Sequence, residues 1–244
     1  MIKRFAFDAI GALSHAISPD ALARVEKCMH FKALFAKYAI DLIFDVGANG
    51  GQFATTMRDY GFAGDIFSFE PVAAEFATLA EKTKTDPKWT AVHCALGASE
   101  GEKIINVMAD SVFSSFNMPS TAATAAFKNE NRIIGTETVK VWRLDAVISE
   151  SQLAARLPRA LLKCDTQGFD LHVLQGAGDH LKDIRLLQVE MSVSKIYQNA
   201  PSMTEMLRFL NDRGFAPVAL FPVNRLADGS VVEFDYLGVN RLLA

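Results

Sequence analysis

Five short apolar runs recur along the chain, each ending in polar or glycine residues. They span residues 41–46, 65–70, 90–95, 160–165 and 185–191. Runs this short and apolar are typical of strands buried on both faces, as in a parallel sheet. Helix-like stretches lie between them, at residues 52–60, 73–84, 170–175 and 202–212. Alternation of strand and helix predicts a doubly wound α/β sheet.

Two parts of the chain depart from this alternation. Residues 102–108 and 138–144 carry β-type side chains and flank a stretch rich in Ser, Ala and Asn, residues 109–137. We expect that stretch to form a loop or short helix over the sheet. Residues 215–222 and 231–239 predict a terminal hairpin, because the Asp-Gly pair between them is a turn signal.

The first forty residues predict two helical segments that are broken at Ser18-Pro19, where a serine cap precedes a proline in the first turn. We therefore divide the chain into an N-terminal helical extension, residues 1–40, and one α/β domain, residues 41–244. The basic pair Lys3-Arg4 leaves open a contact of the first segment with a membrane surface.

Composition excludes several classes of protein. Half of the residues are hydrophobic and 22% are charged, which fits a folded domain. The net charge of −3 provides no broad basic surface for nucleic acid. The three cysteines are far apart, which argues against disulfides and favours a reducing, cytoplasmic location. No apolar run is long enough to predict a transmembrane helix.

The sharpest motif follows the first strand. It consists of an acid, a glycine-rich turn and a helix start: Asp45, Gly47, Asn49, Gly50 and Gly51. Glycines permit a tight turn and let a ligand approach the main chain closely. Glu70 lies 25 residues after Asp45, at the end of the next strand. An acid at that distance can accept hydrogen bonds from both ribose hydroxyls of an adenosine.

The motif also bears on which adenosine cofactor is bound. Asn49 occupies the second glycine position of the dinucleotide fingerprint, where a pyrophosphate needs bare backbone. Asp45 adds negative charge, which disfavours a diphosphate and suits a cation. S-adenosylmethionine carries a sulfonium and an ammonium group and no phosphate, so the motif favours this methyl donor over NAD. A glycine-rich turn without a ligand is the structural alternative.

A second constellation ends the fourth strand. Lys163 and Asp165 point to the same face by the period of two, and Gln167 follows in the turn. Asp165 and Glu190 each end a strand near the glycine turn, where they can orient or deprotonate a methyl acceptor. In the structural alternative, Asp165 caps the following helix and Glu190 pairs with Lys163.

Metal binding is not expected, because no histidine cluster with ligand spacing occurs. A hard-cation site built from Asp145, Asp165 and Glu190 is the alternative, and the sequence does not show whether these side chains meet.

Five blocks of the chain follow one another in the order of a known family. They are DVGANGGQF, FEP (69–71), ALG (95–97), KCDTQGFDLHVLQGA (163–177) and LLQVEMS (186–192). In these blocks the chain resembles the FkbM family of S-adenosylmethionine-dependent methyltransferases, from about residue 41 to 240. It departs from the family at Cys164 and Thr166, which replace aliphatic residues, and at Asp170, which replaces a glutamate.

The resemblance implies a class I methyltransferase fold, with a seven-stranded sheet whose last strand is antiparallel. It implies that the methionine side of the cofactor lies against Asp45, Gly47, Asn49 and Gly51, and the ribose against Glu70. The adenine would border Cys94, Ala95 and Leu96. Phe53, Pro71 and Asp165, which belong to the same blocks, are also expected at the cofactor. Family members mostly methylate hydroxyl groups, often on sugars or secondary metabolites.

The loop at residues 110–120 is expected either to form a lid over the cofactor or to contribute hydroxyl groups to it, with Ser115 at the cofactor. Phe116 and Tyr197 are expected at the acceptor, because aromatic rings stack on sugar faces, although such rings equally fill cores. Gln167, in the turn after Asp165, is also expected there. Two other functions stay open. One is a cofactor-binding module without catalysis. The other is an NAD-dependent oxidoreductase, which Asn49 and the missing Tyr-x-x-x-Lys pair disfavour. A homo-oligomer is also left open.

Overall fold

The computed structural model describes residues 18–120, 130–193, 196–226 and 228–243. Its main sheet has the strand order β3-β2-β1-β7-β8-β10-β9. The strands are β1 (Leu42–Val46), β2 (Asp65–Phe69), β3 (Trp89–Val92), β7 (Ala160–Cys164), β8 (Leu186–Ser192), β9 (Phe215–Arg225) and β10 (Val231–Asn240). β10 runs antiparallel to both of its neighbours, and the other neighbouring pairs are parallel. The predicted doubly wound sheet with an antiparallel last strand is confirmed, as is the terminal hairpin.

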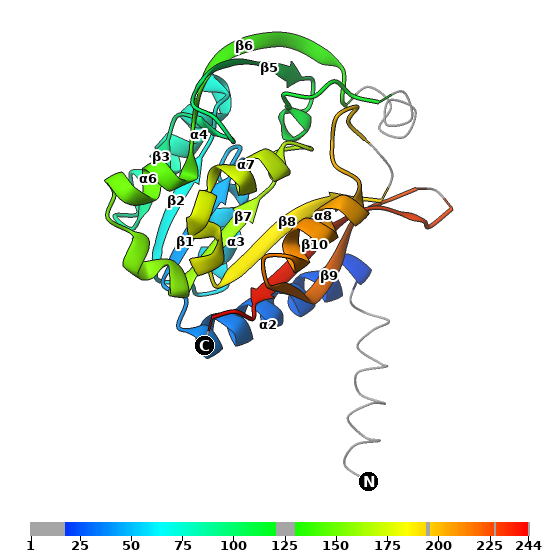
Figure 1. Ribbon diagram of the computed structural model, residues 1–244. Coiled ribbons are helices and arrows are strands. Elements are labelled where there is room, and N and C mark those ends of the chain that lie inside the picture. Colours follow the sequence, from blue (N-terminus) through cyan, green and yellow to red (C-terminus); the bar gives the residue numbers. More distant parts are fainter. Residues whose placement is uncertain (1–17, 121–129, 194–195, 227, 244) are drawn as a thin grey trace.

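A second sheet of three strands lies beside the first, in the order β4-β6-β5. Its strands are β4 (Ala95–Leu96), β5 (Gly101–Met108) and β6 (Ile133–Trp142). In Figure 1, β5 and β6 form an arch at the top of the view. The prediction of one strand over residues 90–95 is wrong, because the chain turns after Val92 and Ala95 pairs with Val141. The predicted strand 138–144 is also corrected, since β6 starts earlier and a helix begins at Leu144.

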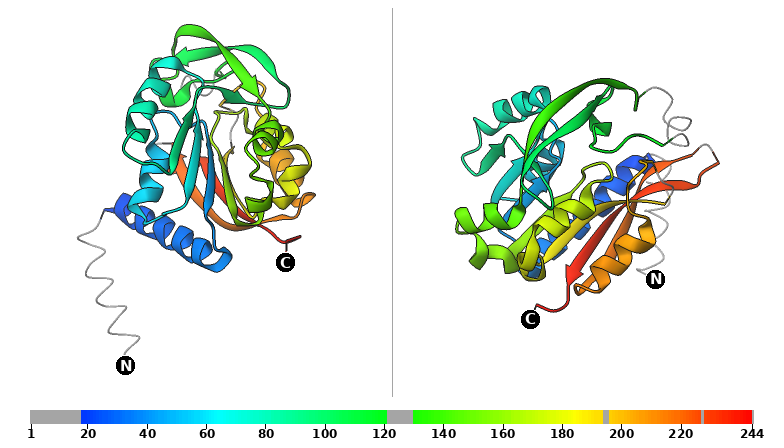
Figure 2. Two further views of the ribbon diagram at one scale, coloured as in Figure 1. Left: turned by 90° about the vertical axis from the view of Figure 1, so that its left-hand side faces the viewer. Right: turned by 45° about the horizontal axis from the view of Figure 1, so that its top comes forward.

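Helices connect the strands on both faces of the main sheet (Figures 1 and 2). They are α2 (Pro19–Tyr38), α3 (Gln52–Asp59), α4 (Ala73–Thr83), α6 (Leu144–Glu150), α7 (Asp170–Gly176) and α8 (Met203–Asn211). Short 3-10 helices are η1 (Ser111–Phe113), η2 (Ala154–Arg159) and η3 (Gly178–Asp183). As predicted, Ser18 caps α2, and its hydroxyl accepts a hydrogen bond from the amide of Ala21 at 3.2 Å.

The side chains of β1 alternate between two buried clusters, which explains an apolar run that only Asp45 interrupts. Leu42 and Phe44 pack with residues of α6, α7 and α8, whereas Ile43 packs on the opposite face with residues of α2, α3 and α4. Phe31 of α2 is fully buried in this second cluster. Burial on both faces places β1 at the centre of the fold.

Some predictions fall outside the described residues. These are the first helical segment with Lys3 and Arg4, and residues 121–129 of the Ser/Ala/Asn-rich stretch. The domain boundary at residue 40 stays a prediction. In the part of the chain that the structure describes, no helix combines the length and apolar character needed to cross a bilayer.

Candidate functional site

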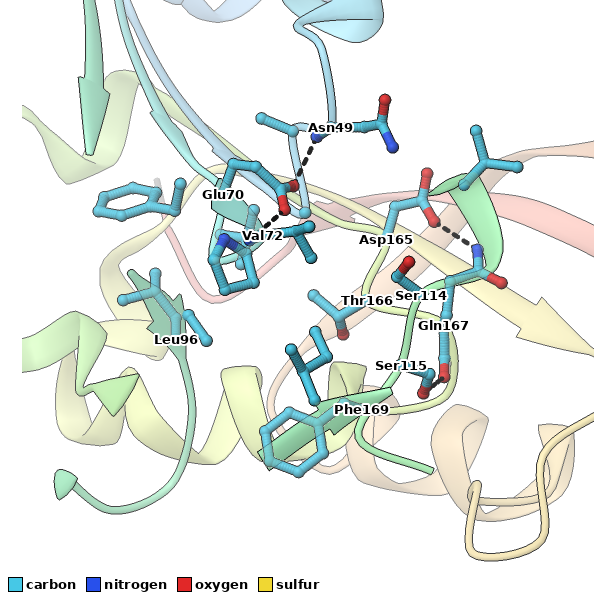
Figure 3. Close-up of a pocket in the computed structure, with 18 of the residues that line it drawn as sticks. Asn49, Glu70, Val72, Leu96, Ser114, Ser115, Asp165, Thr166, Gln167 and Phe169 are labelled. Atoms are coloured by element: carbon cyan, nitrogen blue, oxygen red, sulfur yellow. Dashed lines mark hydrogen bonds between the residues drawn. The ribbon is translucent and has the colours of Figure 1, made fainter. Parts of the chain in front are cut away.

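A cavity opens at the carboxyl ends of β1, β2 and β7 and is closed on one side by the second sheet (Figure 3). It encloses about 890 Å³, including its open mouth. Nine of the residues predicted at the cofactor line it: Gly47, Asn49, Phe53, Glu70, Pro71, Ala95, Leu96, Ser115 and Asp165. Phe116 and Gln167, which were predicted at the acceptor, lie on the same wall. Five separate segments of the sequence therefore meet here.

Gly47 permits the close approach of two loops. Its φ is +71°, and a Cβ atom there would lie 2.0 Å from the carbonyl oxygen of Asp165. Its amide and that of Ala48 donate to the carbonyl oxygen of Phe69, each at 3.1 Å. A side chain at position 47 would therefore separate the glycine loop from the turn after β7.

Asn49 adopts the left-handed conformation that asparagine tolerates, with φ +47°. Its Oδ1 accepts a hydrogen bond from the amide of Gly50 at 2.7 Å, and its Nδ2 donates to the hydroxyl of Ser111 at 3.0 Å. Asn49 therefore both forms the turn and ties it to η1.

Glu70 presents a buried carboxylate to the cavity, with 5% of the residue exposed. One oxygen accepts the amide of Asn49 and the other the amide of Val72, both at 2.8 Å (Figure 3). Each oxygen has capacity for a further hydrogen bond, which suits a vicinal diol. Burial raises the pKa of Glu70 to about 7, although the two amides and Lys163 act in the opposite direction.

Asp45 lies behind the glycine loop and is fully buried rather than on the cavity wall. Its Oδ2 accepts a hydrogen bond from the hydroxyl of Ser68 at 2.9 Å, and its Oδ1 is 3.1 Å from Nζ of Lys163. The charge of Asp45 is thus matched inside the protein rather than offered directly to a ligand. Gly51 is also absent from the wall, because it packs against the ring of Trp89.

Asp165 lines the cavity with a side chain that is 39% exposed. Its Oδ1 accepts a hydrogen bond from Nε2 of Gln167 at 2.9 Å, and its Oδ2 is 3.7 Å from Nζ of Lys163. The alternative in which Asp165 caps the next helix is wrong, because α7 has no side-chain cap. Asp170 instead accepts the amide of Thr166 at 3.0 Å.

Glu190 lies beside this cavity rather than on its wall, and borders a second space of about 320 Å³. Its Oε2 accepts a hydrogen bond from Nε2 of Gln167 at 2.9 Å. Burial, followed by the charge of Asp165 and other nearby carboxylates, raises the pKa of Glu190 well above its ordinary value. The structural alternative, in which Glu190 pairs with Lys163, is wrong, because the ion pairs of Lys163 are with Asp45 and Asp165.

Gln167 links the two acids to Tyr197. Its Nε2 donates to both acids, and its Oε1 accepts the hydroxyl of Tyr197 at 2.8 Å. Tyr197 is buried and does not line the cavity. Gln167 has φ +53°, a strained conformation for a residue with a side chain, and its carbonyl accepts the hydroxyl of Ser115 at 2.7 Å. These contacts hold Gln167 in place.

Several wall residues were not predicted, among them Val72, Ile105 and Phe169. Lys163 was placed beside Asp165 but not at the cofactor, and Ser111 only as part of the loop at residues 110–120. Ile105 belongs to the second sheet, which the pattern did not reveal. Phe169 lies within the block after the fourth strand, and its ring is 4.7 Å from that of Phe116, centroid to centroid. With Leu96 these residues make one end of the cavity apolar, as an adenine ring requires.

The donor set fits S-adenosylmethionine, with an apolar end, a carboxylate for the ribose at Glu70 and a partly exposed carboxylate at Asp165. No phosphate-binding cation points into the glycine loop from the described wall residues, since Lys163 is paired. Across the described residues, no group of three or more His, Cys, Asp or Glu side chains is placed to hold a metal ion. Asp145 instead pairs with Arg143.

The sheet order and the cavity at its carboxyl edge are the arrangement expected of a class I S-adenosylmethionine-dependent methyltransferase. The profile of the methyltransferase FkbM domain matches residues 45–217, and the chain belongs to this family.

A curated relative is the hexuronic acid methyltransferase AglP of Haloferax volcanii. The two chains are 25% identical over 183 residues, which cover 72% of this chain and 69% of that protein. Solved structures with a similar fold include fibrillarin of Aeropyrum pernix with bound S-adenosylmethionine, at 12% identity and a TM-score of 0.43, covering 82% of this chain and 66% of that one. Magnesium protoporphyrin IX methyltransferase of Synechocystis has 10% identity and a TM-score of 0.44, covering 90% and 81%.

Proposed function

We propose that the protein is an O-methyltransferase that acts on a hydroxyl group of a sugar, a glycan or a secondary metabolite. The observation that carries this proposal is the carboxylate of Asp165, which is partly exposed in the cofactor cavity beside the glycine loop. A carboxylate in this place can accept a hydrogen bond from an incoming hydroxyl, orient its oxygen and take its proton.

S-adenosylmethionine supplies an activated methyl group, so the protein has to align the acceptor rather than activate the donor. Placing the reacting atoms about 3–3.5 Å apart can supply much of the rate. Asp165 adds general-base assistance, which typically contributes roughly 10²–10⁴-fold. As the acceptor oxygen forms its bond to the methyl carbon, the hydroxyl proton passes to Asp165 and S-adenosylhomocysteine leaves.

In this proposal Glu190 supports Asp165 without contacting the acceptor. Burial and the neighbouring carboxylates raise the pKa of Glu190, which weakens its tendency to carry a negative charge beside Asp165. Gln167 and Tyr197, which were expected to contact the acceptor, hold the two acids instead, because both ends of the Gln167 amide are already engaged. Phe116 keeps a place on the wall, but its ring lies against that of Phe169 at the apolar end, so in this proposal it borders the adenine rather than the acceptor.

The name of the Haloferax volcanii relative supports a sugar as the acceptor. A hexuronic acid offers two kinds of oxygen to a methyl donor. Methylation of a hydroxyl gives an ether, whereas methylation of the carboxylate gives an ester. The exposed general base favours the hydroxyl, since a carboxylate nucleophile has no proton to lose.

The test measures formation of S-adenosylhomocysteine with methyl glycosides of neutral hexoses, 6-deoxyhexoses and hexuronic acids. We expect a product whose methyl group resists alkali, as an ether does and an ester does not. Asp165→Asn should lower turnover by roughly 10²–10⁴-fold with little change in S-adenosylhomocysteine affinity. Asp179→Asn, on the exposed surface, is the matched control.

Three outcomes would count against the proposal. An alkali-labile product would replace the hydroxyl with a carboxylate as the acceptor group. Near-normal turnover of Asp165→Asn would remove the base. Tight cofactor binding without turnover on any glycoside would instead favour a cofactor-binding module, or an acceptor of another class.

A further inference from the structure

The only cation among the described residues on the cavity wall is Lys163, and it lies at the centre of the sheet. Lys163 on β7 is the register partner of Asp45 on β1, so both side chains rise from neighbouring strands on the same face. The residue is 3% exposed. A buried ammonium group needs compensation from nearby oxygen atoms.

The ammonium group of Lys163 reaches the underside of the glycine loop. It donates to the carbonyl oxygen of Gly47 at 2.7 Å and lies 3.3 Å from that of Val46. Because Gly47 lies against the turn after β7, this bond also fixes the spacing of the two loops. The ring of Phe53, on the cavity wall, has its centroid 5.6 Å from Nζ.

The same group balances charge. Nζ lies 3.1 Å from Asp45 and 3.7 Å from Asp165. Burial alone would lower the pKa of Lys163, but the two carboxylates outweigh it and raise this pKa, so the ammonium form persists. One positive charge therefore stands against two negative charges, and of the two acids only Asp165 is exposed to the cavity.

We propose that Lys163 is a positioning residue that fixes the glycine loop and, together with Asp45, sets the charge that the cofactor's sulfonium meets. With the ion pair in place, the buried acid is neutralised and Asp165 supplies the attraction. The ion pair thereby limits the ratio of two affinities. These are the affinity for S-adenosylmethionine, whose sulfonium is positively charged, and the affinity for S-adenosylhomocysteine, whose thioether is uncharged.

The test is calorimetric titration with S-adenosylmethionine and S-adenosylhomocysteine in parallel. Asp45→Asn removes one of the two negative charges that face Lys163, so the ammonium group then offsets the charge of Asp165, and S-adenosylmethionine affinity should fall more than product affinity. We expect the ratio of the two affinities to change about tenfold, as for unit charges roughly 10 Å apart at an effective dielectric constant of about 20.

A double variant, Asp45→Asn with Lys163→Met, separates charge from position. It removes both charges, so the affinity ratio should return to about the wild-type value. It also removes the bond to the Gly47 carbonyl, so both affinities should fall together by about tenfold, as for loss of a hydrogen bond to a charged group. Asp65→Asn is the matched control, because it breaks an ion pair with Arg156 at the other end of the sheet.

Two results would overturn the proposal. One is an equal loss of both affinities in Asp45→Asn, and the other is wild-type affinities in the double variant. If circular dichroism shows that Asp45→Asn does not fold, the double variant decides alone, because it leaves no unpaired buried charge. Both ligands are titrated without an acceptor, so this outcome is independent of whether a sugar hydroxyl is methylated.

Discussion

Replacing Glu70 with glutamine tests the site at its ribose position. In the wild type, each carboxylate oxygen holds one backbone amide at 2.8 Å. Glutamine keeps one oxygen and turns an NH₂ group toward the other backbone amide, so one of these two hydrogen bonds is lost. The ribose also loses a charged hydrogen-bond acceptor. Hydrogen bonds to charged groups contribute about 1.5–3 kcal/mol. S-adenosylhomocysteine affinity should therefore fall by roughly 10- to 150-fold.

The raised pKa of Glu70 makes this affinity depend on pH. With a pKa of about 7, the ligand-free protein has this group mostly ionised at pH 8 and about one-tenth ionised at pH 6. If the ribose hydroxyls bind the ionised form, apparent affinity follows the ionised fraction. Wild-type affinity should therefore rise about tenfold from pH 6 to pH 8, with proton release on binding at pH 6.

Calorimetric titrations with S-adenosylhomocysteine at pH 6, 7 and 8 measure both effects. The Glu70→Gln variant is the control for titration of the ligand. Any dependence of affinity on pH that persists in this variant does not come from the Glu70 carboxylate. Equal wild-type affinity across this pH range would refute the role of the ionised carboxylate. Undiminished affinity of a folded Glu70→Gln variant would refute the ribose assignment itself.

Two further perturbations act on the fold. Gly47→Ala should abolish cofactor binding, because the added Cβ would meet the Asp165 carbonyl oxygen at 2.0 Å. Gly61 also has a positive φ but no close neighbour, so the control Gly61→Ala should lower the free energy of unfolding in urea by only about 1 kcal/mol. Burial and the charge of Asp165 raise the pKa of buried Asp170 to about 6. The ionised carboxylate therefore lowers the free energy of unfolding above pH 6, and this loss disappears as the pH falls toward 4. Thermal unfolding of the ligand-free protein should show up to about 3 kcal/mol less of this pH dependence in Asp170→Asn, and an unchanged profile would contradict the reasoning.

Much of the fold could be predicted because the relevant signals are local. Apart from Asp45, the run at β1 is apolar, because Leu42 and Ile43 face opposite clusters that are both buried. The glycine turn and Glu70 were found by spacing within one strand-helix-strand unit. β4 was not predicted, because a strand of two residues is defined only by its pairing, here with Val141 and the residue after it, much later in the chain.

The site was predicted less completely, for the same reason. Asp165 and Glu190 were expected near one cleft, and the structure brings them together through Gln167. That Lys163 neutralises Asp45 depends on β1 lying beside β7, which no local pattern reveals. The helix-cap alternative for Asp165 relied on local spacing and was wrong. The chain turns at Gln167, and the Asp165 side chain lies on the cavity wall.

The central place of β1 also affects the order in which the protein can fold during synthesis. β1 pairs with β2 soon after both are made, but its other edge waits for β7, whose Lys163 lies 116 positions after Gly47. Until then, a short strand with apolar faces has an open edge, and such edges favour misassociation. Contacts this distant also slow folding. The cofactor site is completed late, so S-adenosylmethionine can stabilise the finished domain but cannot assist its first half.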